Sequence, residues 1–339
     1  MLKLNFTGVH QFLKIMNLLR KDINPSEEIW DELFANPGYT KLIQIELSRE
    51  FFQQYFKIAY MPSKNQERQE IAHGDNEIIK NILLHYINVL KNEDKINNFL
   101  TGYKSRINEK RILKYTMEYL PANGFSKEAE IFFLVFANDA RGYDIIIFDV
   151  LFALNMEDQD LLELILAHEL HHLYRNKILC FDITKIEAED RGIIMVINQI
   201  HSEGVADQID TEKWIYDGYH KIKDPFLKNY AMQYRELCKK APELIMKLDK
   251  KMIDIFIDCI EDVNNINLYL PLSGHVIGYY MVNKVMEICG QDIIIETVNN
   301  PFQFFEIYNT VAKEHNLVAF SESIMGLIKE MEKKYVLGL

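Results

Sequence analysis

The chain has 339 residues, of which 48% are hydrophobic and 26% are charged, so it can bury a sizeable core and its composition argues against disorder. Its formal net charge is −12, and a surface with that excess of acidic groups repels phosphate backbones. The totals therefore exclude a general nucleic-acid-binding protein and favour one large or two ordinary globular domains.

The cysteines and the N-terminal stretch are typical of a reducing compartment. Four cysteines stand far apart in apolar contexts without a CxxC pair, which predicts buried free thiols. Apolar residues near the N-terminus recur at helical spacing, without the basic segment, continuous apolar stretch and small-residue cleavage site that make up a signal peptide. No apolar run reaches the roughly 18 residues that a membrane span needs. We therefore expect a cytoplasmic protein without a membrane span.

Helical periodicity fills residues 1–124. Apolar residues recur at helical spacing in two stripes, Phe12, Ile15, Leu18 and Leu19, and then Ile79, Ile82, Leu83, Tyr86 and Leu90. The histidines of this region are scattered, and no catalytic groups gather here. We predict an N-terminal helical region, 1–124, that holds no catalytic residue.

The composition changes beyond residue 124. The segments EIFFLVFA (130–137) and DIIIFDVLFAL (144–154) are rich in β-branched and aromatic residues, and NDARGY separates them, which predicts a β-hairpin. A helix should then begin near Asn155, as its N-cap, and run to about Tyr174. The rest of the chain is helical in period. The sequence predicts an α+β fold, mostly α-helical, with a small antiparallel sheet or hairpin over that helix in a second domain, 125–339.

The predicted helix contains the pattern HExxH in the stretch AHELHH, residues 167–172. His168 and His172 are one helical turn apart, so both imidazoles can bind one zinc ion. Glu169 lies beside them, where it can act as a general base on water. His171 could compete as a ligand, but we favour a supporting role for it. The alternative is a helix that buries its histidines in the core, and the place of the motif after a hairpin argues against it.

A catalytic zinc site needs a third protein ligand. The longer pattern HExxHxxGxxH would supply it, but Arg175 and Ile178 occupy the later positions. Downstream, Glu203 and Asp207 lie on one face of a predicted helix, with small residues between them that would let two helices approach closely. We predict that Glu203 completes the coordination and that Asp207 accepts the N–H of a liganding histidine. A solvated acidic pair is the alternative.

These motifs also carry a family resemblance. AHELHH followed by EGVAD resembles the gluzincin clan of zinc metallopeptidases, in which a glutamate in ExxxD follows HExxH. More narrowly, the chain is similar to uncharacterised bacterial families of zinc-dependent peptidases, and GHVIGYYM (274–281) and NPFQFFEIYN (300–309) share that similarity. The resemblance covers about residues 125–310 and leaves the first 120 outside. Glu203 follows His172 by 31 residues, a longer step than in thermolysin-like members, which implies an inserted loop or extra helical turn.

The resemblance implies a gluzincin-like catalytic core, in which a β-sheet lies over the metal helix and an edge strand pairs with an extended peptide. By this analogy one strand of the 130–150 hairpin borders the cleft, and residues 138–143 line its entrance. Hydrolysis also needs a group that stabilises the oxyanion. His275 and Tyr279 are four residues apart on a predicted helix that Gly274 opens, and either could donate to that oxygen.

The sequence thus predicts a zinc-dependent hydrolase, foremost a peptidase, with Zn²⁺ as cofactor and a peptide or small molecule as substrate. Two other functions stay open: the same zinc site acting on a non-peptide small molecule, and a non-enzymatic helical binding protein with a vestigial metal site. The base Glu169 argues against the second, because a structural site has no use for it. Structural zinc sites are also closed by four Cys or His ligands, a set that this sequence does not offer in any local pattern.

Overall fold

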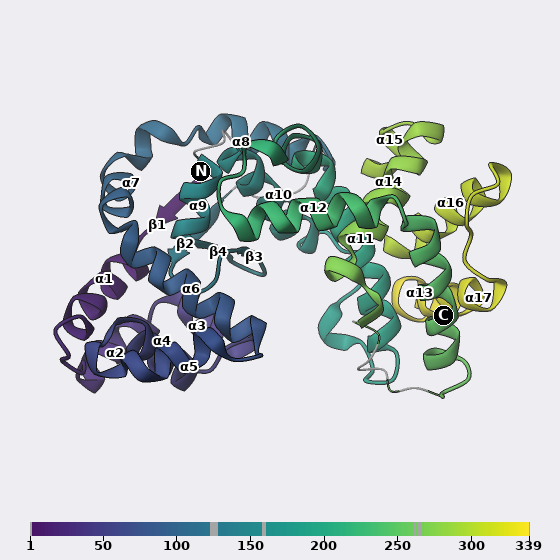
Figure 1. Ribbon diagram of the computed structural model, residues 1–339. Coiled ribbons are helices and arrows are strands. Elements are labelled where there is room, and N and C mark those ends of the chain that lie inside the picture. Colours follow the sequence, from purple (N-terminus) through teal and green to yellow (C-terminus); the bar gives the residue numbers. More distant parts are fainter. Residues whose placement is uncertain are drawn as a thin grey trace. The chain divides into compact units, whose positions relative to one another are not determined.

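The computed structural model describes residues 2–122, 128–157, 161–260, 262, 266 and 268–338 (Figure 1). The chain divides into two compact units, and each unit is built from two segments. The first unit comprises Met1–Glu109 and Ser126–Glu163, and the second comprises Lys110–Phe125 and Leu164–Leu339. The strands beyond residue 124 thus belong with the N-terminal helices.

A mixed sheet lies in the first unit. Its strands are β1 (Leu2–Asn5), β2 (Ala129–Leu134), β3 (Ala140–Gly142) and β4 (Ile146–Asp149), in the order β1-β2-β4-β3. The two central strands, β2 and β4, are parallel, and their apolar residues are buried almost without interruption, as is usual for strands covered on both faces. β1 pairs parallel with β2, and β3 pairs antiparallel with β4, so β1 and β3 form the two edges.

The predicted hairpin of residues 130–154 is wrong in two respects. Its two long segments pair in parallel, because the short strand β3 lies between them in the chain and forms the antiparallel partner of β4. The second segment also leaves the sheet early: the Asp149 carboxylate accepts the N–H groups of Leu151 and Phe152 and starts α9 (Val150–Glu157). Asn155 therefore lies inside a helix that the sequence analysis read as strand, and is not an N-cap.

Helices cover this sheet, as the periodicity of the N-terminal region predicts. Among them, α1 and α3 pack on β2, and α9 packs on β4. The edge strand β1, which precedes α1, was not expected from the sequence. The helices of the first unit besides α9 are α1 (Thr7–Leu19), α2 (Glu27–Phe34), α3 (Pro37–Ile45), α4 (Arg49–Tyr60), the 3₁₀ helix η1 (Pro62–Lys64), α5 (Asn65–His73), α6 (Glu77–Lys91) and α7 (Glu93–Arg106).

In the part of the second unit that the structure describes, all regular elements are helices. Two mostly buried helices, α11 and α14, pack against each other, and α12, α13 and α16 pack on α14. The α-helices are α8 (Glu109–Met117), α10 (Leu162–Asn176), α11 (Arg191–Thr211), α12 (Pro225–Cys238), α13 (Ala241–Phe256), α14 (His275–Cys289), α15 (Asp292–Thr297), α16 (Pro301–Glu314) and α17 (Glu322–Glu332). Shorter elements are the 3₁₀ helices η2 (Ile183–Lys185), η4 (Tyr219–Lys221) and η6 (Pro271–Gly274), and the π-helices η3 (Glu212–Asp217) and η7 (Lys333–Leu337). The prediction of a mostly helical α+β chain is confirmed.

α11 and α14 cross with their backbones in contact. A Cβ atom added at Gly204 would lie 2.4 Å from the carbonyl carbon of Gly278, and one added at Gly278 would lie 2.1 Å from the carbonyl oxygen of Ile200. Only glycine fits at both positions of this crossing. The small residues after Glu203 were expected to let the helix of the HExxH motif approach, but the helix that packs on Gly204 is α14.

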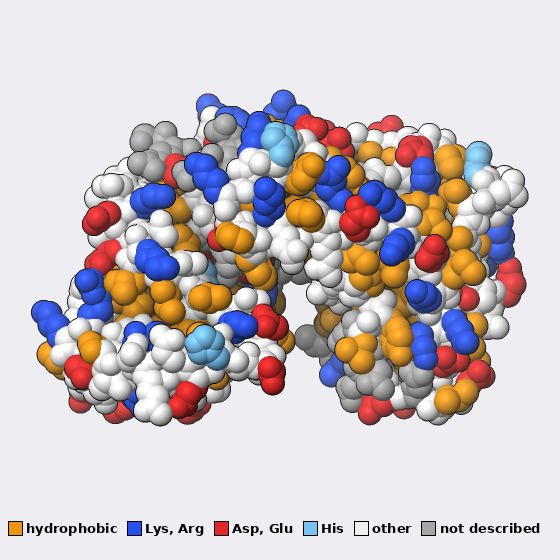
Figure 2. Space-filling view, viewed as in Figure 1, with side chains coloured by type: hydrophobic (Ala, Val, Ile, Leu, Met, Phe, Trp, Pro, Cys, Tyr) orange, Lys and Arg blue, Asp and Glu red, His pale blue; other side chains and the backbone are white. Residues whose placement is uncertain are grey.

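The surface carries charges of both signs. On the face shown in Figure 2, Lys and Arg side chains are interspersed with Asp and Glu side chains. The cysteines are free, as expected, but Cys259 and Cys289 are exposed, so the prediction that all four are buried is wrong. Within the described residues, no helix combines the length and the apolar character that crossing a bilayer requires.

Candidate metal centre

The first half of the candidate site lies on α10. His168 and His172 are buried one helical turn apart, and their Nε2 atoms face each other at 3.0 Å. Because a neutral imidazole carries only one proton, two Nε2 atoms at this distance need a shared proton or a shared cation between them. Such a pair of nitrogens is a natural place for a metal ion.

Glu203 of α11 meets both rings. Its Oε2 atom lies 3.2 Å from Nε2 of His172 and 3.7 Å from Nε2 of His168. Between the two helices the chain runs through a connection that contains η2 and then through three turns of α11, which accounts for the long step between His172 and Glu203. Two motifs far apart in the sequence thus lie together.

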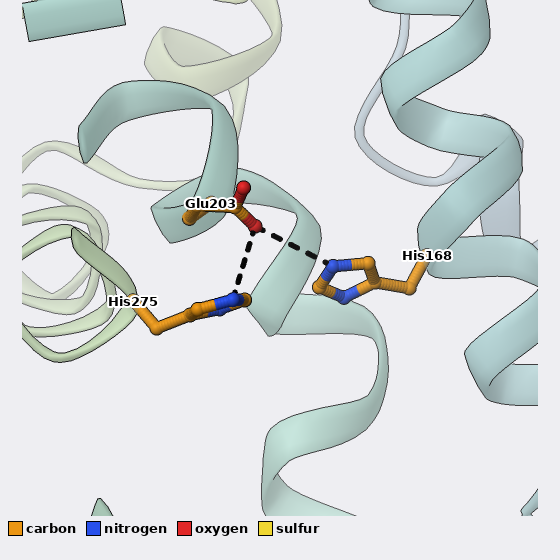
Figure 3. A group of neighbouring side chains, drawn as sticks. All are labelled: His168, Glu203 and His275. Atoms are coloured by element: carbon orange, nitrogen blue, oxygen red, sulfur yellow. Dashed lines mark ion pairs between the residues drawn. The ribbon is translucent and has the colours of Figure 1, made fainter. Parts of the chain in front are cut away.

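A third histidine reaches the same oxygen. Nε2 of His275, the first residue of α14, lies 3.4 Å from Oε2 of Glu203. Figure 3 shows that His168, Glu203 and His275 come from three helices and point their polar ends toward one another. The ligand atoms of these three residues lie within 4.8 Å of one another, close enough to bind one metal ion.

Residues of α11 hold the rings of α10 in place. Nδ1 of His168 lies 3.1 Å from Oδ1 of Asp210, and Nδ1 of His172 lies 2.9 Å from Oγ of Ser202. When Nδ1 donates its proton to these oxygens, Nε2 keeps a free lone pair that can bind a metal. Neither partner was expected from the sequence, although Asp210 follows Glu203 by seven residues and therefore shares its helix face.

Asp207 anchors His275. Its carboxylate oxygens lie 3.0 and 3.1 Å from Nδ1 of His275, and one of them accepts the hydroxyl of Tyr234, on α12, at 2.8 Å. Asp207 was expected to accept the N–H of a liganding histidine, and the histidine that it bonds is His275. His168 is nearer to Asp210 than to Asp207, whose Oδ1 lies 3.8 Å from its Nδ1.

The buried charges of the site compensate one another. Burial opposes ionisation of Glu203, but His275 and His172 outweigh it and hold the pKa of the carboxyl well below its usual range. Burial likewise opposes a charge on His275, yet Asp207 and Glu203 raise its pKa to about 9. For His168, the nearby Asp210 raises the pKa well above the usual value against the effect of burial. The acidic groups thus favour positive charge at this place.

The remaining predicted residues lie around this group. Glu169 is buried beside His168, whose pKa its charge helps to raise. His171 is fully buried, and its Nε2 faces the carbonyl oxygen of Tyr119 at 3.4 Å. Tyr279 packs its ring 6.2 Å from the ring of Tyr234, next to the anchor of His275.

The comparison with protein families decides the classification. The family model described as "Putative zinc dependent peptidase (DUF5700)" matches residues 30–317. The chain belongs to this family. The narrower resemblance noted in the sequence is thereby confirmed, although the match begins in α2 and includes most of the N-terminal region that the resemblance left out. No curated protein and no solved structure matches the chain.

The donor atoms present suit the zinc ion that the family description implies. Zinc binds imidazole nitrogen and carboxylate oxygen, and it usually takes four ligands at about 2.0–2.2 Å. His168 and His172 offer these atoms from buried positions and Glu203 from a partly buried one, each histidine with its second nitrogen already anchored. The residues therefore fit zinc.

Proposed function

We propose that the chain is a zinc-dependent peptidase of the gluzincin type, with His168, His172 and Glu203 as protein ligands of the metal. One observation carries the proposal: Nε2 of both histidines and Oε2 of Glu203 lie within 3.7 Å of one another. Membership of the zinc-dependent peptidase family supports the same reaction class. We propose that Asp207 and His171 support this ligand set, with Asp207 acting on His275.

A zinc ion bound here would polarise the scissile carbonyl and bring the pKa of a water molecule to about 7. Glu169 then acts as the general base and takes a proton from the attacking water. The water oxygen bonds to the carbonyl carbon, the carbon–nitrogen bond breaks, and Glu169 returns its proton to the leaving amine. His275 or Tyr279 donates a hydrogen bond to the oxyanion that forms in between.

The metal content of purified variants tests the ligand set. We expect about one zinc per chain in the wild type, and loss of the metal in His168→Ala and Glu203→Ala, because each variant lacks one of the three proposed ligands and binds zinc more weakly. Elemental analysis after dialysis against zinc measures this. Exposed His315, on the same unit, provides the matched control His315→Ala, which should keep its zinc. Full zinc content in Glu203→Ala would refute the assignment.

The substrate class needs a separate experiment. Incubation of the zinc-loaded protein with a peptide mixture and a panel of small esters and amides, followed by mass spectrometry, separates a peptidase from a zinc hydrolase of small molecules. We expect new peptide termini that are absent after chelation. Turnover of esters alone would favour the small-molecule hydrolase, and no turnover in either panel would favour a binding protein.

A further inference from the structure

Three imidazole rings reach one carboxylate oxygen in the same way. His275 lies as close to Oε2 of Glu203 as the two histidines of α10 do, at 3.4 Å against 3.7 Å for His168 and 3.2 Å for His172. In every ring Nδ1 meets a side-chain oxygen of α11, which leaves Nε2 to face Glu203. His275 therefore matches the two histidines of the HExxH motif both in its distance from Glu203 and in the anchoring of its Nδ1 atom.

The separations suit a shared ion better than direct ion pairs. Charge-assisted hydrogen bonds between nitrogen and oxygen are about 2.7–2.9 Å long. Two donors that each bind zinc at about 2.0–2.1 Å with a tetrahedral angle between them lie roughly 3.3 Å apart. The distance from Nε2 of His275 to Oε2 of Glu203 is 3.4 Å and matches the second value.

We propose that His275 is a fourth protein ligand of the metal in the substrate-free protein, so that the resting site holds three imidazoles and one carboxylate. This inference rests on the proposed zinc site and deepens it. Four protein ligands fill a tetrahedral zinc site, so one of them has to yield before substrate can reach the metal. The side chain of His275 is 22% exposed, against 8% for His168 and 9% for His172, so it is the histidine with room to move; the side chain of Glu203 is 19% exposed.

The backbone before His275 supports such a movement. Leu272, Ser273 and Gly274 have φ values of 48°, 56° and 92°, so three successive residues adopt a left-handed conformation. For the first two residues this conformation is strained. His275 follows directly as the first residue of α14, and a change in this short segment would turn its ring without unfolding the helix.

X-ray absorption at the zinc edge tests the proposal, because it counts the imidazoles bound to the metal. We expect three imidazoles in the zinc-loaded wild type and in the control His315→Ala, and two in His275→Ala. Competition with a chromogenic chelator should show a zinc affinity at least about tenfold lower for His275→Ala, since even residues that only orient zinc ligands cost 10–100-fold. Far-UV circular dichroism checks the fold, and His275→Gln serves as the second variant if the alanine variant unfolds.

The outcomes separate this inference from the proposed function. Two imidazoles in the wild type, or an unchanged zinc affinity in both His275 variants, would overturn the inference and leave the ligand set of His168, His172 and Glu203 intact. A wild-type protein that binds no zinc would overturn both. Three imidazoles that fall to two in His275→Ala would establish His275 as a ligand.

Discussion

The two histidines of α10 differ in what holds them. His168 meets the buried carboxylate of Asp210, whereas His172 meets the hydroxyl of Ser202. A carboxylate partner makes an imidazole a more basic ligand than a hydroxyl does, and it fixes the tautomer more firmly. If both histidines bind the proposed metal ion, we therefore expect His168, anchored by Asp210, to be the stronger ligand.

Glu169 is the residue whose replacement separates chemistry from metal binding. Glu169→Gln should keep about one zinc per chain and lose roughly 10²–10⁴-fold in turnover, because the amide cannot take the proton from water. Steady-state kinetics on a cleaved peptide, with zinc content measured on the same sample, tests this. Glu287 is exposed on α14, so the control variant Glu287→Gln should retain full activity. Turnover by Glu169→Gln at the wild-type rate would remove the general base from the mechanism.

The sequence predicts which side chains of the candidate site share a helix face where helix spacing alone relates them. His168 and His172 are four residues apart on α10, and their proximity follows from that spacing. The grouping of Glu203 with them is also as predicted, and its role as a ligand stays a prediction. The anchoring of His275 by Asp207 and the contribution of Tyr234 depend on how separate helices cross, and no local pattern encodes that crossing. For this reason the sequence suggested His275 only as an oxyanion donor, whereas in the structure it lies in a group with His168 and Glu203 that could hold a metal ion.

At the scale of helices, a buried arginine joins α10 to α11. Arg175 is fully buried, and its guanidinium donates to Oδ1 of Asn198 at 2.9 Å and to Nδ1 of His201 at 3.2 Å. Burial lowers its pKa to about 10. His201 itself stacks on Phe304 and lies about 200° around the helix from Glu203. This contact, one turn beyond His172, fixes the spacing across which Glu203 meets the two rings.

The crossing of α11 and α14 gives a prediction about helix spacing. Gly278→Ala should lower the free energy of unfolding by about 1–3 kcal/mol, as overpacking does, because the added Cβ meets the backbone of Ile200 and Gly204 and cannot turn aside. The variant should also bind zinc more weakly, since α14 has to move and carries His275 with it. Urea unfolding and chelator competition measure the two effects.

Gly326 on α17 provides the matched control for this prediction. A Cβ added there meets nothing within 4 Å, so Gly326→Ala should raise the free energy of unfolding by roughly 0.5–1 kcal/mol through helix propensity alone. Its zinc affinity should equal that of the wild type. If Gly278→Ala proves as stable as Gly326→Ala, the close crossing does not exist in solution.

The elements that the sequence misassigned have a common physical cause. Residues of α9 are buried on all sides, so they show no helical period, and their aromatic and β-branched side chains are typical of a strand. The short edge strand β1 is stabilised by pairing with β2, more than a hundred residues away, and its own residues carry little signal. Amphipathic helices such as α1 were predictable because one face alone is buried.

At the scale of the whole molecule, the family match spans both of the domains that the sequence predicts, 1–124 and 125–339. It covers residues 30–317 and so includes strands β2, β3 and β4 of the mixed sheet as well as the candidate metal centre, whereas β1 and α1 precede it. From residue 30 on, the N-terminal region is therefore part of the family match. The edges of the mixed sheet are β1 and β3, and pairing of a peptide with an edge strand stays a prediction.

The charge balance of the site predicts how zinc and pH together set the stability of the protein. In the metal-free protein the pKa of His275 is about 9 against an ordinary 6.5, so its contribution to stability is complete below pH 6.5 and is lost as the pH rises through 9. His168 acts in the same direction. Zinc binds neutral imidazole, so a protonated ring has to lose its proton before it can bind the metal. Because fewer of these rings are protonated as the pH rises from 6.5 to 9, the stabilisation that zinc provides should grow over that range.

Urea unfolding of the metal-free and zinc-loaded protein at pH 6.5, 8 and 9 measures both trends. We expect the free energy of unfolding of the metal-free form to fall across this range, and the difference between the two forms to widen. His275→Gln removes one of the titrating rings and should flatten the fall in the metal-free form. A metal-free protein whose stability is constant or rises from pH 6.5 to 9 would show that Asp207 and Glu203 do not hold a proton on His275, and that the acidic residues of α11 are not poised to receive a cation.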